Sequence, residues 1–286
     1  MIAGLLLGLG ASMCWAIANV AIQRSTRAVG IVPALVWSQI VGGTGLLALA
    51  AVLDRPTEPW TAATIAWAGL GGVATCLAYL GLFYATAHGR LSIVVPIVSS
   101  WALLSAAIGV GLLGQRAGAA TLAGALLVVA GVVLVARSAR DDTSTARPTE
   151  RRALWAAVAG AVGFGTLIPA IDQIAPAAGR LGAVALVFAV DLALAVPIAC
   201  ARRLALVPRG GGGRAALLTT AVFEAAGFAC ASLGGARAPL AIVAPAASVS
   251  APLTVLWAWL VLGERPGGLA ASGAVLSAAG VLLLAG

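Results

Sequence analysis

Ten long hydrophobic runs, separated by short polar connections, cover most of the 286 residues. They lie at about residues 2–22, 32–53, 62–87, 91–113, 118–136, 153–171, 180–201, 215–236, 240–262 and 268–285. An α-helix rises about 1.5 Å per residue, so the uncharged run 240–262 would extend roughly 35 Å, enough to cross a bilayer with some tilt. The pattern predicts an all-α integral membrane protein with ten transmembrane helices.

The chain also contains an internal repeat with an offset of 149 residues and no gap. The offset aligns like residues, for example Pro245 with Pro96. We predict a first repeat at 1–137, a polar linker at 138–151 and a second repeat at 152–286. Each repeat holds five spans, and two tandem copies with an odd number of spans enter a membrane from opposite sides. The sequence therefore predicts two inverted five-helix repeats.

Composition agrees with a membrane protein. The chain is 62% hydrophobic and 9% charged, with a mean hydropathy of +1.07, which leaves too little polar surface for a soluble globule. The formal charge of +8 raises the possibility of nucleic-acid binding. The arginines lie in short connections rather than in a basic stripe with aromatic residues, so we predict a membrane-topology role and no nucleic-acid partner.

The end of the second repeat has a distinctive order of residues. Pro245 lies in the middle of a span, Trp257 precedes the sequence Gly263, Glu264 and Arg265, and glycines recur in the last span. This order resembles the EamA repeat of the drug/metabolite transporter superfamily. The resemblance implies a ten-helix transporter whose central cavity is walled by the first, third and fourth spans of each repeat.

The orientation in the membrane stays open. The connections after spans one, three, five, seven and nine hold 13 of the 17 arginines. Because arginine-rich connections stay in the cytoplasm, this count favours both termini outside. Ten-helix members of the family usually keep both termini in the cytoplasm. In either case we expect a multi-pass protein of the inner (plasma) membrane.

Two acids, Asp191 and Glu224, lie in the middle of hydrophobic spans. An ionised carboxylate in hydrocarbon costs several kcal/mol unless it faces a cavity or a partner, so such acids are functional candidates. Their repeat counterparts are Gly42 and Thr75, so the acids belong to one repeat only. Each acid could be a counter-ion for a substrate ammonium group or a proton carrier. The alternative is a protonated or paired carboxyl that serves packing alone.

Aromatic and polar residues at similar depth form the candidate wall of the cavity. The predicted substrate-binding residues are Trp15, Asn19, Tyr79, Ser99, Trp101, Phe164, Asp191, Glu224, Ser248 and Trp257. Tryptophan and tyrosine also collect at membrane interfaces, but Trp15, Tyr79 and Trp101 lie deeper in their spans. Packing between helices is the alternative for each of these residues.

Repeated prolines and small residues suggest how the spans bend and pack. Pro96 and Pro245 each remove a helix hydrogen bond, so we predict hinges beside the site, with a static kink as the alternative. Small residues four apart, such as Gly273 and Ser277, allow helices to approach closely. They would either pack the two repeats together or form the face of a homodimer.

Motifs for enzymatic chemistry are missing from the sequence. It has no phosphate-cradling loop and no metal-ligand spacing, and it holds a single histidine, so we expect no enzyme activity, no metal and no cofactor. The sequence predicts a secondary transporter, an exporter of small metabolites such as amino acids, that works by alternating access. One alternative is an antiporter that exchanges protons for lipophilic cations through Glu224. A membrane scaffold without transport is the other.

Overall fold

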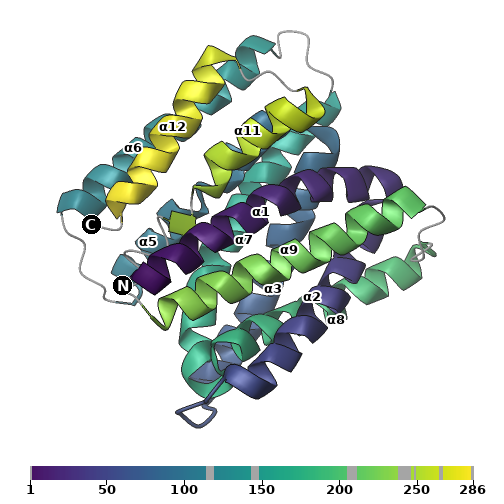
Figure 1. Cartoon of the computed structure of the whole chain (residues 1–286), viewed down its shortest axis with the longest axis vertical. Helices are drawn as coiled ribbons and strands as arrows, with labels where there is room; N and C mark the ends of the chain where they lie inside the picture. Colours follow the sequence, from purple (N-terminus) through teal and green to yellow (C-terminus); the bar gives the residue numbers. More distant parts are fainter. Residues whose placement is uncertain are drawn as a thin grey trace.

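The structure is a computed structural model that describes residues 2–113, 119–142, 148–204, 211–237, 246–247, 249–263 and 267–284. These residues are largely helical, and none of them forms a strand, so the all-α prediction is confirmed (Figure 1). The helices are α1 (Ile2–Val29), α2 (Ile31–Leu53), α3 (Ala62–His88), α4 (Leu91–Val98), α5 (Trp101–Gly111), α6 (Ala119–Asp142), α7 (Pro148–Ala178), α8 (Arg180–Ala201), α9 (Gly211–Gly235), α11 (Ser250–Leu262) and α12 (Gly268–Leu284).

Seven helical segments among the described residues are long and apolar enough to cross a membrane. They are α1, α2, α3, the stretch Leu91–Gly109 that joins α4 and α5, α7, α8 and the part of α9 at Gly213–Gly235. The chain is therefore a multi-pass membrane protein. The full number of ten spans stays a prediction.

Equivalent helices of the two repeats begin at equivalent residues. Gly30 has a φ of 93° and starts α2, and its counterpart Gly179 has a φ of 80° and starts α8. Both turns are so short that one residue must adopt a positive φ, which glycine does without a steric penalty. The equivalent helices α2 and α8 pack antiparallel, and so do α6 and α12, while α1 packs on α9 and α3 packs on α7.

Glycines allow the closest of these contacts. A Cβ atom added at Gly81 of α3 would lie 2.6 Å from the Ala156 carbonyl oxygen of α7, and one at Gly131 of α6 would lie 2.6 Å from the Gly273 oxygen of α12. Helices without side chains at the crossing approach closely and gain dispersion contacts. The small residues of α6 and α12 thus pack the two repeats together within one chain.

The fourth span differs from the single helix predicted at 91–113. It is broken into α4 and α5, with a turn at Ser99 and Ser100 three residues after Pro96. The carbonyl oxygen of Ile97 accepts both the backbone N–H of Ser100 at 3.1 Å and the Ser100 hydroxyl at 2.7 Å, which closes the turn. In the second repeat α11 begins at Ser250, the counterpart of Trp101, and the predicted hinge Pro245 lies outside the described residues.

The polar linker predicted at 138–151 is partly helical. Helix α6 continues to Asp142 and α7 begins at Pro148, so each enters the linker. Proline suits the first turn of a helix because its missing N–H would have no partner there.

Candidate functional site

A small cavity lies where helices of both repeats meet. Its described lining residues are Trp15, Asn19, Leu82, Val95, Val98, Ser99, Trp101, Phe164, Ile168, Glu224, Phe228 and Ser250. The space open to the centres of water molecules is about 60 Å³, and by that measure one water needs about 10–15 Å³. In this conformation the cavity therefore has room for a few waters rather than for a metabolite.

Glu224 is the carboxylate of this cavity. Its side chain is 5% exposed, and its Oε2 accepts a hydrogen bond of 2.7 Å from the hydroxyl of Tyr79. No arginine among the described residues forms an ion pair with it. A buried carboxylate with a single hydrogen bond costs several kcal/mol when ionised. Glu224 therefore favours a proton or a cationic ligand in the cavity.

Two equivalent aromatic pairs flank Glu224. The rings of Trp15 and Phe228 lie 5.3 Å apart at 73°, and those of Phe164 and Tyr79 lie 5.4 Å apart at 69°. The offset of 149 residues relates one pair to the other. Such edge-to-face pairs are rigid and apolar, and the faces of aromatic rings attract ammonium groups. The walls therefore suit an organic cation whose charge is opposed by Glu224.

Asn19 connects the cavity to α11. Its Nδ2 donates to the hydroxyl oxygen of Thr254 at 3.0 Å, and that hydroxyl donates to the Ser250 carbonyl at 2.8 Å. This chain of hydrogen bonds holds α1 against the start of α11. Asn19, Ser99 and Ser250 supply the described uncharged polar side chains of the lining.

Asp191 lies apart from this cavity, between α2, α3 and α8. It is fully buried, and its Oδ2 accepts a hydrogen bond of 2.6 Å from Gln39 Nε2. The Cys76 thiol lies beside the carboxyl, and Oδ1 has no hydrogen-bond partner of good geometry in the described part of the chain. The prediction placed Asp191 in the wall, whereas the side chain faces α2.

Six of the ten predicted residues line the cavity: Trp15, Asn19, Ser99, Trp101, Phe164 and Glu224. Tyr79 is 1% exposed and lies behind the wall, as the partner of Glu224. Trp257 lines a different groove together with Arg24, and it packs against a buried cluster that includes Val20 and Val95. Ser248 lies outside the described residues.

Several lining residues were not among the predicted site residues. These are Leu82, Val95, Val98, Ile168, Phe228 and Ser250. For Phe228 the repeat provides a signal, since it is the counterpart of Tyr79. Ser250 is the counterpart of Trp101. The aliphatic residues carry no signal, because a leucine in the wall resembles a leucine that faces lipid.

A multi-pass helical membrane protein with a cavity between two repeats has the arrangement typical of membrane transporters. The model of the EamA-like transporter family matches residues 2–137 and 151–286. The chain therefore belongs to the EamA-like transporter family, within the drug/metabolite transporter superfamily.

A solved structure, described only as a crystal structure of a protein, has a similar fold. It is 20% identical, with a TM-score of 0.69, and the match covers 98% of this chain and 96% of the other. At this identity the likeness supports the fold alone. No curated protein matches the sequence. Among the described residues, no group of three or more histidine, cysteine or acidic side chains could hold a metal ion.

Proposed function

We propose that this protein is a secondary transporter that exports small organic metabolites bearing an amino group, such as amino acids. The observation that supports the proposal is Glu224, a buried carboxylate in an aromatic cavity without an arginine partner among the described residues. An ammonium group would supply the missing countercharge, and the rings of Trp15 and Phe228 would surround it. Asn19 and Ser99 would donate hydrogen bonds to the rest of the solute.

We further propose that the two five-helix repeats lie in the inner (plasma) membrane with opposite orientations and alternate access to the cavity. The antiparallel packing of α2 on α8 and of α6 on α12 supports this arrangement, since equivalent helices of an inverted pair run in opposite directions. A cavity of about 60 Å³ by this measure has room for about four to six waters, less than the bulk of most amino acids. The helices must therefore separate at one end before a solute enters.

The broken fourth span is a suitable place for that movement. Residues Ser99 and Ser100 interrupt the helix beside the cavity, and irregular backbone at membrane depth is tolerated where it lines a cavity. We propose that α4 and α5 tilt relative to each other at this turn. Pro96 has no amide hydrogen, so fewer backbone hydrogen bonds oppose the tilt.

The second candidate is an antiporter that exchanges protons for lipophilic cations. One observation favours it, because no arginine or lysine lines the described cavity to bind the carboxylate of an amino acid. In this function Glu224 would release its proton when the cation binds and recover one after the cation leaves. A scaffold without transport has less support, since it offers no reason for an acid in an aromatic cavity.

The experiment is performed with the purified protein in proteoliposomes that contain a trapped pH-sensitive dye. Neutral amino acids and then lipophilic cations are added outside, and uptake of the same solutes is followed with radiolabel. Uptake of amino acids supports the metabolite transporter, and a pH change that requires a lipophilic cation supports the antiporter. The variant Glu224→Gln should abolish either signal. Glu58→Gln, an exposed acid of the loop between α2 and α3, is the matched control. If no solute of either class is transported, the proposal is wrong.

A further inference from the structure

A second groove lies between α2, α3 and α8, away from the substrate cavity. The space in this groove that is open to the centres of water molecules is about 540 Å³. Most of its described lining is apolar and includes residues 29–33, Leu80, Ile198 and Leu204. Ile198 and Leu204 are exposed on the outer surface, which in a membrane protein faces lipid. The charged residue of this lining is Arg202, at the end of α8.

In the second repeat, a carboxylate lies beside the start of α8, the helix equivalent to α2. At the opposite end of the same helix pair, α8 begins after Gly179, and the Gly182 amide donates to Asp54 Oδ2 at 2.7 Å. Asp54 follows the last residue of α2. A carboxylate there is stabilised by the free amides and by the positive end of the helix dipole. The start of α8 thus carries its own anion.

At the start of α2, none of the residues that the structure describes supplies such an anion. The counterpart of Asp54 is Arg203, so a cation stands where the other repeat has a carboxylate. Arg203 has a φ of 51°, a conformation that favours glycine, yet the position holds a large charged residue. The first-turn amides of Ile31 and Val32 have no main-chain acceptor in the described part of the chain, as is usual at the start of a helix. Arg202 lines the groove and Arg203 follows it in sequence. An anion between these arginines and the positive end of the α2 dipole would be stabilised by both.

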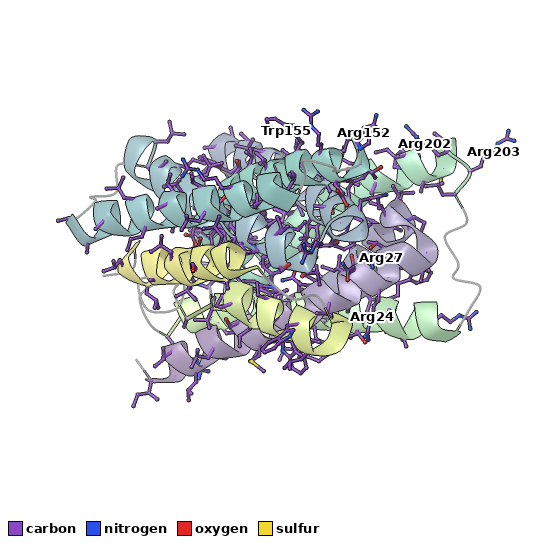
Figure 2. All side chains as sticks on the ribbon, turned by 90° about the horizontal axis from the view of Figure 1, so that it is seen from above. Arg24, Arg27, Arg152, Trp155, Arg202 and Arg203 are labelled. Atoms are coloured by element: carbon purple, nitrogen blue, oxygen red, sulfur yellow. The ribbon has the colours of Figure 1, made fainter. Side chains whose placement is uncertain are left out.

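This end of the protein is also rich in arginine. Figure 2 shows its labelled arginines in one half of the molecule: Arg24, Arg27, Arg152, Arg202 and Arg203. Figure 1 shows both chain termini at the other end. Arginines near a membrane surface attract the headgroups of anionic lipids. The charge and the apolar lining therefore point to one ligand that has an anionic head and a hydrocarbon tail.

We propose that the groove between α2, α3 and α8 binds an anionic phospholipid. The phosphate lies between the first turn of α2 and the guanidinium groups of Arg202 and Arg203, and an acyl chain fills the groove along Ile198 and Leu204. In effect the lipid phosphate replaces the carboxylate that Asp54 provides in the other repeat. Pro33, the counterpart of Gly182, has no amide hydrogen, so the arginines supply the remaining contacts. This inference does not depend on the proposed substrate.

The test is native mass spectrometry of the delipidated protein in detergent, with phosphatidylglycerol and phosphatidylcholine added at equal concentration. The wild type should bind phosphatidylglycerol preferentially. An arginine at a membrane surface changes the affinity by about fivefold, so the double variant Arg202→Gln/Arg203→Gln should lose about 25-fold of this preference. The matched control is Arg152→Gln, an exposed arginine outside the lining that is also labelled in Figure 2. It should retain the preference.

A second variant tests the comparison between the repeats. Arg203→Asp supplies the missing carboxylate, and aspartate tolerates a positive φ better than most residues. It should lose phosphatidylglycerol binding without losing thermal stability in lipid-free detergent. The proposal is wrong if the wild type binds both lipids equally, or if Arg152→Gln reduces the preference as much as the double variant does. It is also wrong if inorganic phosphate at the same concentration raises the melting temperature as much as phosphatidylglycerol, since the acyl chain would then contribute nothing.

Discussion

The close crossing of α3 and α7 allows a sharp prediction for the substitution Gly81→Ala. The added methyl group would lie 2.6 Å from both the Ala156 oxygen and the Gly160 nitrogen of α7. Ordinary van der Waals contact begins at about 3.4 Å, so α3 and α7 must separate by roughly 0.8 Å. Both obstructing atoms belong to a helix backbone and cannot rotate away. Overpacking of this kind costs about 1–3 kcal/mol, equivalent to a fall in melting temperature of roughly 2–12 °C in a protein of this size.

The assay is thermal unfolding of the purified protein in detergent, followed by a thiol-reactive dye or by light scattering. Gly69→Ala is the matched control because Gly69 lies on the same helix with no atom within 4 Å of the added Cβ. Alanine favours a helix over glycine by about 1 kcal/mol, so the control should be neutral or slightly more stable. If Gly81→Ala proved as stable as Gly69→Ala, the close packing of the two repeats described above would be wrong.

Three further predictions concern the acids and the orientation. Tyr79→Phe removes the hydrogen bond to Glu224, and a hydrogen bond to a charged group is worth about 1.5–3 kcal/mol. The apparent KM for a transported amine in liposomes should therefore rise about tenfold or more. An unchanged KM would contradict this role of Tyr79. Gln39→Leu removes the amide that donates a hydrogen bond to Asp191, so it should lower the stability by about 1–3 kcal/mol. The double variant Gln39→Leu/Asp191→Leu should recover most of the loss. Equal melting temperatures for the wild type and Gln39→Leu would refute this prediction. The arginine distribution predicts that an epitope tag at the C-terminus is accessible in intact spheroplasts, and a tag that becomes accessible only after lysis would favour the cytoplasmic termini usual in the family.

The helical class and part of the candidate site could be predicted from the sequence, because both follow from the lengths of the apolar runs and from the position of a residue within its run. The uncharged runs predict helices, and the offset of 149 residues also relates the turns that the structure shows at Gly30 and Gly179. Glu224 was identified because a carboxyl group in the middle of an apolar span needs a partner.

The direction of a side chain around its helix was harder to predict. Asp191 and Glu224 have similar depth and chemistry, yet one faces Gln39 of α2 and the other faces the cavity. Apolar residues surround such a helix on almost every side, so the sequence pattern does not distinguish the face toward the cavity from the other faces. The break at Ser99 and Ser100 was also missed, since serine and proline are common inside transmembrane helices and interrupt only some of them.

The measurement that tests the central claim most directly is exchange of labelled solute across the membrane of proteoliposomes. Liposomes loaded with an unlabelled neutral amino acid or an unlabelled lipophilic cation are placed in a trace of the same labelled solute, with no proton gradient. The account predicts that the wild type and Glu58→Gln accumulate label for one of the two solute classes and that Glu224→Gln does not. Accumulation by Glu224→Gln at the rate of the wild type would contradict the claim that this carboxylate, in this cavity, binds the transported amine.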